Sequence, residues 1–333
     1  MILFPRHILL ALFLGLLAAG VPCARAAASP AELLASGRVD DAIHALKDRV
    51  QLAPKDAAAY DLLTRTYFYM GHWDEAAAAS EHAVALEPSN SEYQLWMARA
   101  VGEKAAHASF VTAVRMVPKI RAGFERAVQL DGSNAEARTD LAEFYMEAPA
   151  FLGGGKDKAL AQAEVLNTQD PSAAHWIKGR LAERAKKFDV AEQEYRAAVS
   201  SSKHSTEHIL DLASFYRGRG RFDEMEEAVK KAASGDIWQT SVPFDAALLL
   251  FNAGKNFSGA ADLLERYLAG SFQTESAPAY QAHYLLGQIR EKQGNPQGAA
   301  AEYSAALTLA NEFGPAQAAL GRVNQEYRFA STK

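Results

Sequence analysis

Apolar side chains recur along the chain at spacings of three and four residues, in pairs of segments joined by a short turn. In one pair, Tyr60, Leu63 and Tyr67 precede Gly71, and a stripe of small residues that begins at Ala76 follows it. Spacings of three and four place side chains on one face of an α-helix, and glycine readily takes the positive φ at which a helix ends. The pattern therefore predicts two helices that pack face to face, with a turn at Gly71.

The same pair of segments returns at a fixed distance along the chain. Gly37 and Pro54 lie 34 residues before Gly71 and Pro88. A period of this length is typical of helical hairpins stacked side by side. We therefore predict an all-α solenoid of about eight such units, closed by a helix over residues 315–329 that covers the last apolar face.

Three segments are longer than a regular hairpin requires, near 103–116, 147–156 and 269–278. Around the first we predict two lengthened helices with a break at Val117-Pro118, because the residue before a proline resists the α conformation. Phe110 and Val111 in this segment are expected to pack within the array. If the first two segments have a function of their own, it is to form a surface for a partner.

Residues 57–90 resemble one tetratricopeptide repeat, whose first helix follows the pattern W-x2-L-G-x2-Y. Tyr60, Leu63, Thr64 and Tyr67 occupy the four positions, so that Tyr60 and Thr64 depart from the pattern. Weaker copies cover nearly all of residues 30–329. The resemblance implies a right-handed superhelix with a concave groove that is lined by residues of the first helix of each unit.

The resemblance also implies which residues line this groove and contact a partner. They are four arginines, one glutamate that sits among them, and three aromatic or apolar residues: Arg65, Arg99, Arg180, Arg217, Glu143, Trp176, Tyr284 and Leu249. Because arginine presents a rigid fork of donors that suits carboxylates, we predict that the arginines bind an acidic segment or C-terminus of an extended polypeptide. Alternatively, the arginines pair with neighbouring acids as a solvated face, and the aromatic residues belong to the core.

Residues 1–26 have the features of a secretory signal peptide. A positive charge near the start precedes an apolar run over residues 8–19, and small residues follow up to Ala26. The run is shorter than the roughly 20 residues that a helix needs to span a bilayer. We therefore expect cleavage after Ala26 or Ala28, a periplasmic or secreted location, and a single solenoid domain over residues 27–333.

Composition restricts the partners further. The only cysteine, Cys23, lies in the leader, so the mature chain forms no disulfide of its own. Lys and Arg total 35 against 40 Asp and Glu, and the leader holds two arginines and no acid, so the mature chain carries a formal charge of −7. A mildly acidic chain is a poor general binder of nucleic acid. We also expect no membrane insertion of the mature chain.

Two short motifs could carry chemistry. The string from His204 to His208, with Glu207 inside it, matches the H-x-x-E-H pattern of inverted zinc peptidases, but it straddles a turn, whereas that chemistry needs both imidazoles on one rigid helix. The glycine-rich segment 153–156 lacks the Ser/Thr and the preceding strand of a nucleotide-binding loop. We therefore predict no catalytic residue, no metal ligand and no cofactor.

These observations favour a non-catalytic scaffold of the cell envelope that binds a protein or peptide partner in its concave groove. One alternative is a receptor that passes a small acidic ligand to a transport system. An enclosed cavity lined by arginines would favour this alternative. A second alternative is a zinc-dependent hydrolase. The sequence predicts neither the identity of the partner nor the oligomeric state.

Overall fold

The computed structural model describes residues 28–202, 205–270 and 273–331, and every regular element within them is a helix. The elements are α1 (Pro30–Ala35), α2 (Val39–Leu52), α3 (Ala57–Met70), α4 (Trp73–Leu86), α5 (Ser91–Ala106), α6 (Phe110–Leu130), α7 (Ala135–Glu147), the 3₁₀ helix η1 (Ala150–Leu152), α8 (Lys156–Gln169), α9 (Pro171–Arg184), α10 (Phe188–Ser201), α11 (Ser205–Gly218), α12 (Phe222–Ala233), α13 (Val242–Ala253), α14 (Phe257–Ala269), α15 (Ala279–Lys292), α16 (Pro296–Leu309) and α17 (Gly314–Ser331). The prediction of an all-α chain is confirmed.

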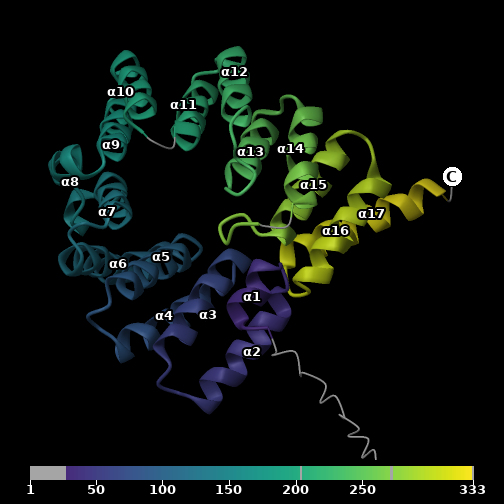
Figure 1. The fold of residues 1–333 in the computed structure, drawn as a ribbon, viewed down its shortest axis with the longest axis horizontal. Helices are drawn as coiled ribbons and strands as arrows, with labels where there is room; N and C mark the ends of the chain where they lie inside the picture. Colours follow the sequence, from purple (N-terminus) through teal and green to yellow (C-terminus); the bar gives the residue numbers. More distant parts are fainter. Residues whose placement is uncertain (1–27, 203–204, 271–272, 332–333) are drawn as a thin grey trace, which may run out of the picture.

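Consecutive helices pair into hairpins, and the hairpins stack side by side into a superhelix (Figure 1). The odd-numbered helix of each hairpin comes first and lines the inner side, while the even-numbered helix lies on the outside. Small side chains such as Ala76, Ala142 and Ala213 are fully buried where helices meet, and they let the helix axes approach closely. The last helix, α17, packs on α16 as predicted for the closing helix.

The turn at Gly71 forms as the sequence predicts. Gly71 ends α3 with a φ of 74°, and its N–H donates to the carbonyl of Phe68 at 3.1 Å. The chain then re-enters a helix at Trp73. Five further glycines in turns share a positive φ: Gly37, Gly153, Gly220, Gly254 and Gly294. The repeated turn chemistry therefore sets the hairpin boundaries.

The predicted break at Val117-Pro118 is wrong. Helix α6 runs uninterrupted through Pro118, and the turn lies at residues 107–109 instead. A proline inside a helix removes one main-chain hydrogen bond and crowds the preceding turn. The buried Ile120 and Phe124 anchor α6 directly after the proline, and this packing outweighs the local preference.

Phe110 and Val111 do not pack within the array, because their side chains are 79% and 59% exposed. Helices α5 and α6 have 16 and 21 residues, against 13 and 14 in the next hairpin, so the tip of this hairpin extends beyond its neighbour. Phe151, in the second long segment, is also exposed. In the described part of the chain, no helix is both long enough and apolar enough to cross a membrane.

The two ends of the superhelix meet, so that the described chain forms a closed ring (Figure 1). The main-chain N–H of Asn311 donates to the Asp40 carboxylate at 2.8 Å, and the Gln281 amide donates to the Tyr69 carbonyl at 2.6 Å. Phe313 shares one apolar cluster with residues of α2 and α3. We call this junction, with α1–α3 on one side and residues 273–316 on the other, the seam; the sequence pattern did not predict it.

Gly154, in the loop between α7 and α8, occupies a position with no room for a side chain, because a Cβ there would overlap the carbonyl group of Ala148. We expect Gly154→Ala to lower the free energy of unfolding by about 2 kcal/mol, since the backbone must move to relieve the overlap. Urea unfolding and hydrogen exchange in α7 and α8 measure the effect. Gly155→Ala is the matched control, since its Cβ would lie 3.8 Å from the nearest atom; equal losses in both variants would contradict the prediction.

Candidate functional site

Three hollows on the inner face join into one groove. The first, of about 590 Å³, lies mainly between α5, α7 and α9. The second, of about 410 Å³, lies between α9 and α11, and the third, of about 560 Å³, lies between α11 and α13. Arg180 lines the first two hollows, and Asp211 and Arg217 line the last two. We call this continuous surface, from α5 to α13, the inner groove.

Arg99 is the most firmly held of the predicted groove arginines. Its Nε lies 2.6 Å from the Asp140 carboxylate, its Nη2 lies 2.6 Å from the Glu136 carboxylate, and the guanidinium lies 4.8 Å from the centre of the Trp96 ring. These two carboxylates raise the pKa of Arg99 despite its burial. Burial nevertheless keeps the pKa of Asp140 above its ordinary value, so this carboxylate is only partly compensated by Arg99.

Arg180 is held more loosely. Its guanidinium nitrogens lie 3.7 Å from the carboxylates of Glu143 and Glu147, and its carbon lies 5.3 Å from the centre of the Trp176 ring. Glu147 has a closer partner in Arg184, at 2.6 Å. Burial raises the pKa of Glu143, with further contributions from neighbouring carboxylates. Arg99 and Arg180 are therefore paired with acids, as in the second interpretation of the sequence.

Of three further predicted residues, two line the inner groove and one lies at the seam. Arg217 lines the inner groove, and its buried Nε has no hydrogen-bond partner among the described residues. Trp176 lines the second hollow while packing against the core. Arg65 lies at the seam instead, 3.2 Å from Asp61 and 3.1 Å from Glu275.

Tyr284 does not lie in the inner groove. Its half-buried ring packs against Tyr303 and Phe313, with centroid distances of 5.7 and 5.4 Å, at the edge of the apolar cluster near the seam. Leu249 lines the third hollow but is also buried in the core. For Tyr284 the structure therefore matches the alternative that the sequence left open, in which the aromatic residues belong to the core.

Acidic side chains outnumber arginines in the inner groove. Its lining holds nine acids and four arginines: Glu103, Glu136, Asp140, Glu143, Glu147, Glu183, Glu207, Asp211 and Asp245, against Arg99, Arg180, Arg184 and Arg217. Burial raises the pKa of Asp245 as well as that of Glu143, as expected where carboxylates lack enough cations. The groove thus carries a surplus of negative charge.

Asp140 and Asp245 are among the groove acids that the sequence prediction missed, although a signal for both was present. Asp140 lies three residues before Glu143, and Asp245 lies four residues before Leu249. Residues at these spacings share one face of a helix. Extending each predicted groove position by one helical turn would have found both acids.

The structure describes only part of the zinc-peptidase string. His204 lies outside the described residues, and Glu207 and His208 line the third hollow. Burial acts to lower the pKa of the His208 imidazole. The Asp211 carboxylate, 3.0 Å from His208 Nδ1, together with other nearby acids, outweighs burial and raises this pKa. Among the described residues there is no group of three or more side chains that could hold a metal ion.

Asp61 couples the stability of the seam to pH. The side chain is almost fully buried, and burial, with Glu92 and Glu275 nearby, raises its pKa from 3.8 to about 6 even though Arg65 lies close. A raised pKa means that the protonated acid favours the folded chain: its stabilising contribution is full below about pH 4 and is lost as the pH rises through about 6. We expect Asp61→Asn to raise the free energy of unfolding at pH 7 by about 2 kcal/mol.

Urea unfolding of this variant between pH 4 and 7 measures the prediction, and the pH dependence should flatten relative to the parent. Asp131→Asn is the opposite control, because hydrogen bonds from Ser133 lower the pKa of the exposed Asp131. That variant should lose stability at neutral pH. An Asp61→Asn variant that is less stable than the parent at pH 7 would contradict our account of the buried carboxylate.

Family models of the tetratricopeptide repeat match residues 33–100, 154–206 and 244–318, together more than half of the chain. The chain belongs to the tetratricopeptide repeat family. Proteins of this family typically mediate interactions between proteins and are generally non-catalytic scaffolds. The family resemblance seen in the sequence is thereby confirmed.

Solved structures share the helical repeat. A thermophilic tetratricopeptide protein of Thermus thermophilus is 19% identical over 56% of this chain and 94% of its own, with a TM-score of 0.46. A tetratricopeptide protein from Parabacteroides merdae ATCC 43184 is 18% identical over 80% of this chain and 98% of its own, with a TM-score of 0.40. A comparison with curated proteins found no match. Structural similarities with TM-scores this low give no information about the partner of this chain.

Proposed function

We propose that the protein is a non-catalytic scaffold whose inner groove holds an extended segment of a partner polypeptide, and that this segment carries lysine or arginine side chains. The observation that carries the proposal is that nine acids and only four arginines line one continuous groove. The acid-binding role that the sequence suggested for the arginines is less favoured, because Arg99 and Arg180 already have carboxylate partners.

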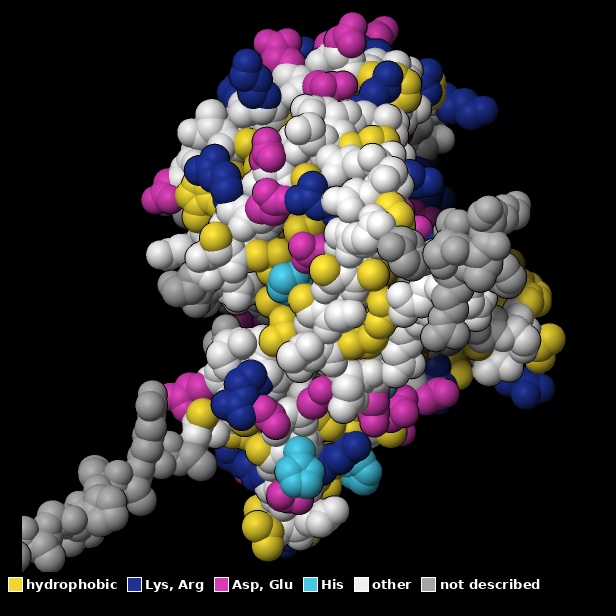
Figure 2. All heavy atoms as spheres, turned by 90° about the vertical axis from the view of Figure 1, so that its right-hand side faces the viewer, with side chains coloured by type: hydrophobic (Ala, Val, Ile, Leu, Met, Phe, Trp, Pro, Cys, Tyr) yellow, Lys and Arg dark blue, Asp and Glu magenta, His cyan; other side chains and the backbone are white. Residues whose placement is uncertain are grey.

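Charge and shape both support a basic segment. A lysine or arginine of the partner would supply the positive charge that carboxylates with raised pKa values, such as Glu143 and Asp245, lack. On the face seen in Figure 2, by contrast, acidic and basic side chains are interspersed with apolar ones. A groove with a net charge steers an oppositely charged partner toward it and raises the association rate. The same surplus disfavours a small acidic ligand, the first alternative.

The proposal is tested with two fluorescent peptides of equal length, one alternating glycine with lysine and one alternating glycine with glutamate. The lysine peptide should bind, and the variant Glu143→Lys/Asp245→Lys should weaken its binding at least tenfold. Glu164→Lys/Asp262→Lys, on the outer helices α8 and α14, changes the net charge equally and should bind as the parent does. Tighter binding of the glutamate peptide, or equal losses in both variants, would contradict the proposal.

We also propose that the protein acts in the periplasm or outside the cell. This rests on the signal-peptide pattern of residues 1–26, which lie outside the described residues. Mass spectrometry of the protein secreted by a bacterial host should find a chain that starts at Ala27 or Ser29. A chain that retains Met1 would contradict the proposed location.

A further inference from the structure

The two rims of the ring differ in charge. The hairpins stack in the same orientation, so the turns inside the hairpins lie along one rim, which we call the turn rim, and the connections between hairpins lie along the other. The turns hold no acid and six basic residues: Arg38, Lys186, Lys187, Arg219, Arg221 and Lys255. The described residues of the connections on the opposite rim include one lysine, Lys55, and seven acids: Asp56, Glu87, Asp131, Asp170, Asp236, Glu275 and Glu312.

Contacts between neighbouring hairpins hold the basic turns of α9–α10, α11–α12 and α13–α14 in one row. Phe188 directly follows Lys187, and the guanidinium carbon of Arg219, in the next hairpin, lies 3.5 Å from the centre of the Phe188 ring. In the same way the Lys255 ammonium lies 4.9 Å from the centre of the Phe222 ring, at the start of α12. Each cation thus rests on the aromatic side chain that follows the preceding turn.

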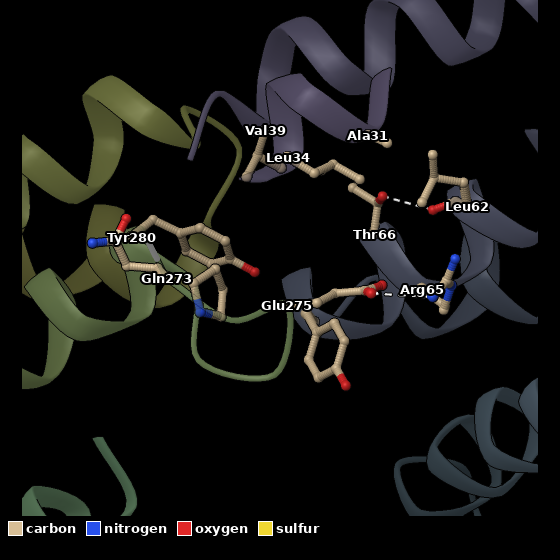
Figure 3. Close-up of a pocket in the computed structure, with 11 residues that line it drawn as sticks. Ala31, Leu34, Val39, Leu62, Arg65, Thr66, Gln273, Glu275 and Tyr280 are labelled. Carbon is tan, nitrogen blue, oxygen red and sulfur yellow. Dashed lines mark hydrogen bonds and ion pairs between the residues drawn. The ribbon is translucent and has the colours of Figure 1, made fainter. Parts of the chain in front are cut away.

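Most of these cations are free to bind an anion. At the seam, Arg65 pairs with Glu275 at 3.1 Å (Figure 3). By contrast, four cations of the row have no carboxylate partner among the described residues: Lys186, Lys187, Arg219 and Lys255. Two acids without a cation partner in the described part of the chain, Asp189 and Asp223, stand in the first turns of α10 and α12. The row therefore keeps an excess of positive charge.

The backbone of Lys186 is a second indication that this row has a use. Lys186 has a φ of 57°, whereas Gly37, Gly220 and Gly294 take a positive φ at the same position of their turns. A left-handed backbone is unfavourable for residues with a Cβ, and it is tolerated where the side chain serves a purpose. A lysine that stands where glycine fits best points to a role for its ammonium group.

The turn rim also carries exposed apolar side chains. Phe110 follows the turn of the lengthened α5–α6 hairpin and is 79% exposed, and Phe151, in the connection between α7 and α8, is 80% exposed. Single side chains on separate turns offer far less area than the roughly 800 Å² per partner of a stable protein interface. A lipid surface, in contrast, takes up apolar side chains one at a time, and its anionic lipids attract cations.

We propose that the turn rim docks on the surface of a membrane that contains anionic lipids. The four unpaired cations lie at the lipid phosphates, and Phe110, Val111 and Phe151 enter the head-group region without spanning the bilayer. The acidic opposite rim then faces away from the membrane, as electrostatic repulsion requires. This surface is separate from the inner groove, and the proposal does not depend on what the groove binds.

Co-sedimentation of residues 27–333 with phosphatidylcholine vesicles, with and without phosphatidylglycerol, tests the proposal. The anionic vesicles should bind about tenfold more tightly or better, and added salt should weaken this binding. Soluble poly-glutamate at the same concentration of charge should leave the protein on the vesicles. Equal binding to both vesicles, or binding to neither, would overturn the proposal. Displacement by poly-glutamate would assign the rim to an acidic polypeptide and would overturn it too.

Variants show whether the row of cations carries the binding. Lys187→Gln/Arg219→Gln/Lys255→Gln should weaken binding to anionic vesicles at least about tenfold, because each cation near an anionic surface contributes roughly fivefold. The matched control Lys55→Gln/Lys230→Gln/Lys231→Gln removes three exposed cations at or near the opposite rim and should bind as the parent does. Equal losses in the two variants would contradict the proposal.

A further variant separates binding from folding at the strained position. Lys186→Gly relieves the left-handed backbone, so it should unfold at a higher urea concentration than the parent and still bind anionic vesicles more weakly. Lys186→Gln removes the charge but keeps the strain, and it should bind as weakly as Lys186→Gly. Parent-like vesicle binding by both variants would contradict a role for the ammonium group.

An environment-sensitive fluorophore identifies the rim that meets the lipid. Residues 27–333 contain no cysteine, so the label can be coupled to Phe151→Cys alone. Leu52→Cys is the matched control, because Leu52 is 88% exposed at the end of α2, on the opposite rim. Anionic vesicles should brighten the label at position 151 and leave the label at position 52 unchanged. The reverse result would place the membrane at the wrong rim and overturn the proposal.

Discussion

Replacing Arg99 by methionine should lower the free energy of unfolding by about 3 kcal/mol at neutral pH. The substitution leaves Asp140 in a largely buried site without its cation, 2.6 Å from where the guanidinium had been. Methionine retains most of the contact with Trp96, so the loss reports the charge rather than the packing. The loss should shrink as the pH falls toward 4, because a protonated Asp140 no longer needs a cation.

Urea unfolding at pH 7 and at pH 4.5 measures this effect. Arg184→Met is the control, since Arg184 makes a comparable pair with Glu147 at a more exposed place and should cost less than about 1 kcal/mol. The double variant Arg99→Met/Asp140→Asn should recover most of the loss. If the single variant matched the parent at pH 7, the buried charge pairs of the inner groove would not have the importance that we give them.

Replacing Phe313 by alanine should cost about 3 kcal/mol and open the ring. The Phe313 ring is almost fully buried and meets the rings of Tyr280 and Tyr284 edge to face, at centroid distances of 5.0 and 5.4 Å. It shares one apolar cluster with residues of α2 and α3, so removing it leaves a cavity between the two ends of the chain. Phe124→Ala, in α6 far from the seam, should cost a similar amount without opening the ring.

Chemical crosslinking distinguishes these two outcomes. The only cysteine lies in the leader, so residues 27–333 accept introduced cysteines without background. The pair Asp41→Cys/Glu312→Cys spans the seam and should be joined by a short bis-maleimide in the parent and in Phe124→Ala, and much less in Phe313→Ala. The pair Asp41→Cys/Glu164→Cys, across the ring, should not be joined. Absence of crosslinking at the seam in the parent would contradict ring closure.

The helices and their order were predictable because they depend on local signals. Periodic apolar residues and the glycine at the turn place the start of α4 at Trp73 and the end of α3 at Gly71. The proline rule failed at Pro118, where the buried side chains that follow it hold α6 together. Local preference is a weak guide wherever tertiary packing opposes it.

Ring closure could not be predicted from a repeat pattern. The pattern reports how each unit packs on the next, whereas the seam depends on the accumulated curvature of all the units and on contacts such as Asp40 with Asn311. The same limit applies to the site. The family positions bring Arg99, Glu143 and Arg180 to one surface, but only the folded chain shows which acid pairs with which arginine.

Photo-crosslinking in the cells that make the protein tests the central claim most directly, namely that the inner groove holds a basic polypeptide segment. Benzoyl-phenylalanine is placed at Ser214 and Asn252, which line the inner groove, and at Val165 and Val190, exposed on the outer helices α8 and α10. We predict adducts from the two groove positions only, on segments that contain lysine or arginine. Adducts from the outer positions alone, or groove adducts on acidic segments, would contradict the claim.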